Sequence, residues 1–147
     1  MVLCLSNIEA VTANELMGKW QTVTQSRDNG ALIVEKEHLV LNPNYTFSIV
    51  IFVSLEKGGA FIKDLRIEGS GIWKNRDNTL VAVVQKVEVP FAKEIYLISQ
   101  ESLRNFANNF KGNFENEPIR ISVIKTMEAN KMTTINENLR ESTYTRY

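Results

Sequence analysis

The sequence is poor in the residues that most often carry out chemistry. It has one cysteine, Cys4, and one histidine, His38, among 147 residues. A single cysteine excludes an internal disulfide and any multi-cysteine metal site, and a single histidine excludes a site built on two imidazoles. No glycine-rich loop leads from a strand into a helix, and no two carboxylates stand out as an acid–base pair. We therefore expect no enzyme, no metal and no other cofactor.

An excess of charge and long apolar runs are lacking as well. Seventeen basic residues balance seventeen acidic ones, which argues against a dedicated nucleic-acid binder because such proteins normally carry a basic excess. No stretch of about 18 apolar residues occurs, so we expect no integral membrane segment. A chain of 147 residues fits one domain, which at this size buries roughly 70 % of its unfolded surface.

The N-terminus allows two interpretations. Residues 2–5 are apolar and Ile8-Glu9-Ala10 follows, which resembles the tail of a signal peptide, although the basic segment and a full-length apolar core are missing. The alternative is a short arm packed against the domain. We divide the chain into residues 1–13, an arm or signal-peptide remnant, and residues 14–147, a single domain. The signal interpretation predicts a periplasmic or secreted protein, and the arm leaves a cytoplasmic one open.

Most of the chain shows the alternation that is typical of β-strands. Residues 45–55, YTFSIVIFVSL, place every second residue from Tyr45 to Val53 on one apolar face. A Gly69-Ser70-Gly71 group predicts a bulge or sharp bend. Turns are predicted at residues 42–45, 58–59, 75–78, 129–130 and 137–138. Eight or nine strands joined in this way predict an all-β, antiparallel sheet closed as a barrel or sandwich.

One segment has a helical period instead. In residues 99–112, SQESLRNFANNFKG, the apolar residues from Leu103 to Phe110 recur at helical spacing. Ser99 is a suitable N-cap and Gly112 a suitable C-cap. The pattern predicts one inserted helix near residues 100–111, which plugs an open end of a barrel or packs on its outside.

The segment ELMGKW, residues 15–20, places Gly18 and Trp20 at the start of a strand. It resembles the opening of the first strand in the lipocalins and their bacterial lipocalin-like relatives, and the terminal YTRY supplies Arg146. NPNYTF at 42–47 and GIWKNRDNTL at 71–80 are also similar to turn-and-strand segments of that family. The resemblance implies an up-and-down barrel whose floor is formed by Trp20 and a stacked Arg146. The alternative is an ordinary core tryptophan beside an edge glycine.

The chain departs from the family in its helix, which lies between strands, whereas lipocalins typically carry theirs after the eighth strand. The resemblance implies a ligand cavity inside the barrel, and the alternative is a solid core. The residues that the alternation offers as its lining are Tyr45, Phe47, Ile49, Ile51, Val53, Phe61, Leu65, Trp73, Val81, Val83, Ile121 and Val123.

Polar side chains that could bind a ligand's head group, here called the polar handle, depend on which face of residues 31–41 points inward. If Leu32, Val34 and Val40 do, then Lys36 and His38 do as well, and this cationic pair suits a carboxylate head group. The alternative is that both charges are hydrated at the mouth of the barrel.

The expected function is non-covalent binding or transport of a small hydrophobic or amphipathic, fatty-acid-like ligand. The alternatives are a protein-interaction or inhibitor module with a filled barrel, and an isomerase or cyclase built on the same barrel. The only partner expected from these observations is the small ligand.

Overall fold

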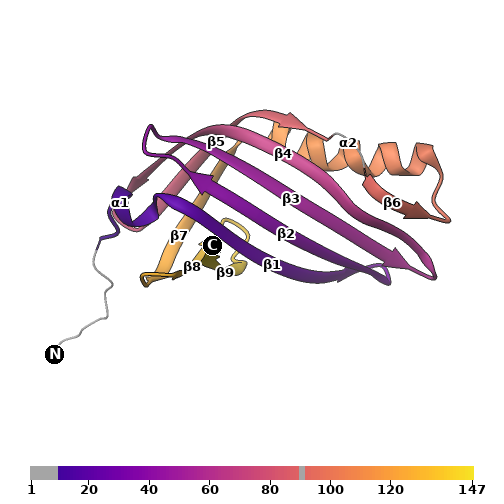
Figure 1. The fold of residues 1–147 in the computed structure, drawn as a ribbon, viewed down its shortest axis with the longest axis horizontal. Helices are drawn as coiled ribbons and strands as arrows, with labels where there is room; N and C mark the ends of the chain where they lie inside the picture. The colour runs from indigo at the N-terminus through magenta and orange to yellow at the C-terminus, as the bar shows by residue number, and fades with distance from the viewer. Residues whose placement is uncertain (1–9, 90–91) are drawn as a thin grey trace.

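The fold is a closed barrel of eight antiparallel β-strands, described by a computed structural model for residues 10–89 and 92–147 (Figure 1). The barrel strands are β1 (Gly18–Asp28), β2 (Ala31–Leu41), β3 (Thr46–Lys57), β4 (Ala60–Arg76), β5 (Thr79–Glu88), β7 (Ile119–Met127), β8 (Lys131–Asn136) and β9 (Glu141–Arg146). Each pairs with the next, and β9 pairs with β1. A ninth strand, β6 (Ala92–Tyr96), extends the sheet along the first part of β4. The predicted up-and-down barrel is confirmed.

The five predicted turns lie at hairpins of the barrel, and a sixth, at Asn29 and Gly30 between β1 and β2, is missed by the sequence-based prediction. Gly58 and Gly59 join β3 to β4 with φ angles of 56° and 87°, a left-handed pair that glycine adopts without strain. The predicted strand at 45–55 begins one residue late, because Tyr45 lies in the preceding turn with a φ of 63°. The predicted bend at residues 69–71 is a shift in the β4–β5 register between Ser70 and Gly71.

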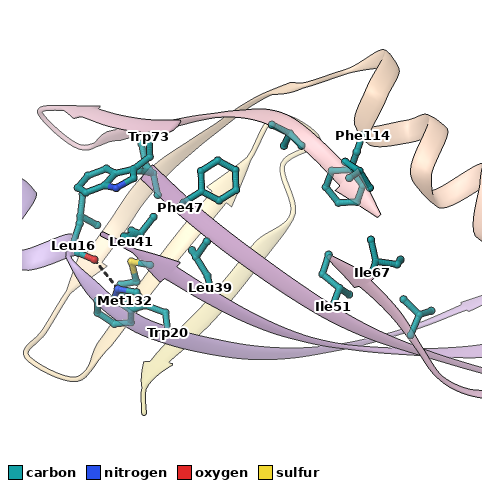
Figure 2. Packing of buried hydrophobic residues seen from close by; sticks show 14 of the residues in the cluster. Leu16, Trp20, Leu39, Leu41, Phe47, Ile51, Ile67, Trp73, Phe114 and Met132 are labelled. Carbon is teal, nitrogen blue, oxygen red and sulfur yellow. Dashed lines mark hydrogen bonds between the residues drawn. The ribbon is translucent and has the colours of Figure 1, made fainter. Parts of the chain in front are cut away.

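The floor of the barrel is formed by Trp20 and the elements around it. The short helix α1 (Ala13–Leu16) precedes β1, and the Trp20 indole N–H donates a hydrogen bond of 2.8 Å to the Leu16 carbonyl (Figure 2). The Arg146 guanidinium lies 4.0 Å from the Trp20 ring centre and donates to the Met17 carbonyl at 2.8 Å. The predicted cation–π stack is therefore present.

The same contact explains the glycine that opens β1. Gly18 has a φ of 125°, and a Cβ atom on it would lie 2.7 Å from a guanidinium nitrogen of Arg146. Any side chain at this position would therefore strain the backbone and displace the arginine from the ring.

The N-terminal part of the described chain belongs to the domain. Val11 is buried, its N–H donates to the Asn78 side chain at 3.2 Å, and its carbonyl accepts from the Asn75 side chain at 2.8 Å. The described end of the predicted N-terminal arm, residues 10–13, therefore packs against the barrel. Cys4 and the apolar residues 2–5 lie outside the described residues.

The helix α2 (Gln100–Asn116) lies across one end of the barrel and packs against β4 and β5 (Figure 1). The Ser99 side chain accepts a hydrogen bond from the Ser102 N–H at 3.0 Å, so the predicted N-cap is confirmed. The predicted C-cap is wrong, because Gly112 lies inside the helix and Glu117 caps it. One turn after Phe110, Phe114 is buried against the barrel, which continues the apolar stripe past the glycine. Across the described residues, neither α1 nor α2 has the length and apolarity that crossing a bilayer requires.

Candidate functional site

Between the floor and α2, the barrel holds a partly open cavity of about 390 Å³. Figure 2 shows two groups of buried apolar side chains in the barrel: Leu16, Leu41 and Trp73 lie near the floor, and Ile51 and Ile67 lie toward Phe114 of α2. A volume of this size falls within the range of roughly 300–1,000 Å³ that is typical of small-molecule pockets. The barrel is therefore not a solid core.

One side of the cavity is apolar. Because side chains alternate along a strand, every second residue of β3 and β5 points inward, and α2 adds two phenylalanines across the open end. The apolar lining residues are Leu39, Phe47, Ile49, Ile51, Leu80, Ala82, Val84, Phe110, Phe114 and Met132, with Ile119 and Ile121 at the rim.

The other side is polar. It is formed by β1, β2 and the three C-terminal strands, and it ends in exposed residues at the mouth. The polar residues of the wall are Thr22, Thr24, Glu35, Glu37, Arg120, Ser122, Thr134, Asn136, Ser142 and Tyr144. Glu117, Glu137, Asn138 and Arg140 border the exposed mouth. The cavity is therefore amphipathic, with an apolar wall facing a wall of carboxylates and hydroxyls.

Glu37 is the central polar group of this wall. The Tyr144 hydroxyl donates a hydrogen bond of 2.5 Å to one of its carboxylate oxygens, although the two residues are 107 positions apart in the chain. Burial raises the pKa of Glu37; the Tyr144 hydrogen bond and the charge of Arg120 oppose this, and the neighbouring charge of Glu35 adds to it. Burial, together with the charge and hydrogen bond of Glu37, also raises the pKa of Tyr144 well above 10. Tyr144 therefore stays protonated and acts as the donor.

The raised pKa of Glu37 predicts the pH dependence of stability. A carboxyl whose pKa is higher in the folded state binds its proton more tightly there, so its contribution to the free energy of unfolding falls as pH rises through the folded-state pKa. Glu37→Gln keeps an acceptor for Tyr144 but removes the charge. We expect the variant to gain stability relative to the unmodified protein between pH 4 and pH 8, as measured by urea denaturation. Glu56→Gln, at an exposed position of β3, is the control. A stability difference for Glu37→Gln that stays constant with pH would contradict the assignment.

Four of the predicted lining residues line the cavity: Phe47, Ile49 and Ile51 on its apolar wall, and Ile121 at its rim. Val53, Leu65 and Trp73 point inward but are packed in the core, each at most 2 % exposed, and do not line it.

Two others lie outside the cavity altogether. Tyr45 is 45 % exposed in its turn and contacts the Trp73 ring, and Phe61 stacks on Tyr96 with 5.6 Å between the ring centres. Predicting them as lining residues was wrong.

The predicted inward direction of four further residues is wrong. In the pairing of β5 with β7, Val81 lies opposite Ile121 and Val83 opposite Ile119, and residues opposite one another share a face. The inward residues of these strands are Leu80, Ala82 and Val84 on β5, and Arg120 and Ser122 on β7. Val81, Val83, Ile121 and Val123 therefore lie on the outer face, although Ile121 also contributes atoms to the rim of the cavity.

The predicted handle of Lys36 and His38 also lies on the outer face. Leu39 pairs with Trp20, and Glu37 pairs with Thr22 on β1 and with Ile51 on β3, so the odd-numbered residues of β2 point inward. The His38 ring instead makes edge contacts with Phe52 and Tyr147, at 6.1 and 5.1 Å between ring centres. The charged groups that face the cavity from β2 are thus two carboxylates, Glu35 and Glu37.

No family model matches this sequence, and a search of curated proteins finds no match either. The class of protein is therefore defined by its architecture alone. It is a closed, eight-stranded, up-and-down β-barrel that holds an amphipathic cavity and has a helix across one end.

Proposed function

We propose that the protein binds a small amphipathic molecule non-covalently inside the barrel, as a carrier, store or sensor. The observation that carries this proposal is the cavity of about 390 Å³, whose apolar wall faces a polar one. An apolar ligand body would displace water from Phe47, Ile49 and Ile51, which is favourable by roughly 25 cal/mol per Å² buried. The resemblance of ELMGKW and Arg146 to the lipocalins supports the same function. The apolar residues 2–5 favour a site of action outside the cytoplasm.

A substitution that fills the cavity tests this function. Ala82 lines the cavity, so Ala82→Phe places a ring in the space that the ligand would occupy. We expect at least tenfold weaker binding of the neutral fluorescent probe N-phenyl-1-naphthylamine, measured by fluorescence titration. Val81→Phe is the matched control, because it adds the same ring on the outer face, one residue away. Equal binding by both folded variants would argue against an interior site.

A second candidate function is protein interaction, and it is favoured by a patch of aliphatic side chains on the outer face of β4, β5 and β7. The exposed members of the patch are Ile72, Ile119, Ile121 and Val123, between 40 % and 55 % exposed. Val81 and Val83 pair with these residues across the strands and complete it. Patches of contiguous apolar surface commonly mark interaction sites. Under this alternative, Ile72→Lys, which changes an exposed patch residue that does not line the cavity, would abolish partner capture and leave probe binding unchanged, as measured by pull-down and fluorescence titration.

A further inference from the structure

The cavity contains two carboxylates without a cationic partner of their own. Glu35 and Glu37 both point inward from β2. Among the described residues, the ion pairs within 4 Å are Arg66–Glu68, Lys86–Glu88 and Lys125–Glu141, all at the surface. No described arginine or lysine therefore forms an ion pair with either cavity carboxylate.

The charged groups around Glu37 come from several strands. Glu35 precedes it on β2, the Tyr144 hydroxyl reaches it from β9, and Arg120 influences it from β7. Thr22, its neighbour on β1, carries no charge. The Arg120 guanidinium is exposed and stacks 4.2 Å from the Phe114 ring centre, so it lies beside α2 and not on either carboxylate.

The mouth of the cavity adds no net positive charge to this region. Glu117 and Glu137 border it together with Arg140. The polar wall as a whole therefore has four carboxylates and two guanidinium groups, and its inner part is acidic.

The hydrogen-bonding capacity of the two carboxylates is only partly used. The Tyr144 hydroxyl occupies one oxygen of Glu37, and the Thr24 hydroxyl lies 3.5 Å from Glu35. An ionised carboxylate accepts through about four lone-pair positions, and an ammonium group offers three N–H donors. Hydrogen bonds between ionised partners are roughly twice as strong as those between neutral groups. A carboxylate ligand, in contrast, would meet charges of its own sign on Glu35 and Glu37.

We propose that the ligand is a small amphipathic amine, whose protonated nitrogen binds to Glu35 and Glu37 and whose apolar body lies along Phe47, Ile49 and Ile51. This rests on the proposed interior binding function and names the chemical class that the site accepts. It also replaces the fatty-acid-like ligand expected from Lys36 and His38.

The test compares three ligands with the same chain length. Octylamine, octanol and octanoate are titrated into the protein at pH 7.5 by isothermal titration calorimetry. We expect octylamine to bind at least tenfold more tightly than octanol, and octanoate to bind more weakly than both. Glu37→Gln and Glu35→Gln should each reduce the affinity for octylamine about tenfold and leave that for octanol unchanged. Glu56→Gln, which removes an exposed carboxylate outside the cavity, should change neither.

The pH dependence provides a second readout. Octylamine stays protonated from pH 5 to pH 8, so the loss of affinity on acidification reports protonation of the protein. The affinity of the unmodified protein should fall as pH decreases toward the pKa of Glu37, which burial raises above its usual value of 4.5, and Glu37→Gln should flatten this profile.

The possible outcomes separate the two proposals. Equal binding of all three ligands, or a preference for octanoate, would overturn the amine assignment and leave interior binding intact. Failure of all three ligands and of N-phenyl-1-naphthylamine to bind the folded protein would overturn the interior site itself. Circular dichroism checks that each variant is folded. If Glu35→Gln and Glu37→Gln lose a similar amount of octylamine affinity, misfolding of a single variant does not explain the loss.

Discussion

Replacement of Trp20 by alanine is expected to lower the free energy of unfolding by about 3–5 kcal/mol, the usual cost of removing a large buried aromatic side chain. Trp20 has no exposed surface, so the substitution leaves a cavity at the barrel floor. It also removes the hydrogen bond to the Leu16 carbonyl and the stack with Arg146. Guanidinium denaturation measures the loss, followed by circular dichroism because Trp73 would dominate the remaining fluorescence.

Trp20→Phe separates the two contributions. It retains an aromatic ring beneath the Arg146 guanidinium but lacks the N–H donor, and it leaves the Leu16 carbonyl without that partner. We expect it to recover a substantial part of the stability that the alanine variant loses. If Trp20→Ala costs less than 1 kcal/mol, the floor described here does not hold the barrel together.

The second large effect is expected from Gly71→Ala, with a loss of about 3 kcal/mol, at the upper end of typical overpacking costs. A Cβ atom at Gly71 would lie 1.9 Å from the Val83 carbonyl oxygen and 3.0 Å from the Phe47 ring. The first obstacle is backbone of the neighbouring strand, so relief requires β4 and β5 to separate at the bulge. Because Phe47 lines the cavity, weaker binding of N-phenyl-1-naphthylamine should accompany the lower denaturation midpoint.

Gly112→Ala is the matched control for this experiment. Gly112 lies within α2, and beyond its two neighbours and the backbone of its own helix, a Cβ atom there would meet no heavy atom within 4 Å. Alanine is favoured over glycine inside a helix by about 1 kcal/mol, so the same substitution should stabilise the protein here. If Gly71→Ala and Gly112→Ala changed the stability in the same way, the close approach of β4 and β5 would not be the reason that position 71 holds a glycine.

Prediction from sequence succeeded where one face of a strand differs clearly from the other. In β3, Ser48 and Ser54 lie on the face opposite to Phe47, Ile49, Ile51 and Val53, and these two polar residues mark the outer face in the sequence. Turn residues such as Gly58-Gly59 mark the strand ends, because glycine tolerates the left-handed conformation that tight hairpins need. These two signals were sufficient for the all-β, antiparallel class, whereas the up-and-down barrel was expected from the resemblance to the lipocalins.

Prediction failed for strands that carry aliphatic residues on both faces. On β2, Leu32, Val34 and Val40 point outward, whereas Leu39 and Leu41 point inward, so alternation alone leaves the direction open. An error of one residue in the assignment exchanges the two faces of a strand. For this reason the sequence-based prediction places Lys36 and His38 on the inward face, where the structure has Glu35 and Glu37. The exposed aliphatic residues of β5 and β7 caused the same error.

The polar wall was missed for a different reason. Glu37 and Tyr144 meet only because β9 returns to β1 and closes the barrel, a pairing between residues more than a hundred positions apart. No local pattern reports such a contact. One signal could have located Glu35 and Glu37: once Trp20 is placed on the floor, hairpin pairing puts Leu39, Glu37 and Glu35 on the same face.

The seam between β1 and β9 has a consequence for synthesis of the chain. Its register comprises the pairs Trp20–Arg146 and Gln21–Thr145, and the bond from Arg146 to the Met17 carbonyl spans 129 positions. The hairpins from β1 to β5 can form as they leave the ribosome, but the underside of Trp20 stays uncovered until Arg146 has emerged. Closure must therefore wait for β9 and is a late step of the slow kind that long-range strand pairing imposes, and until then the edge of β1 that faces β9 stays unpaired.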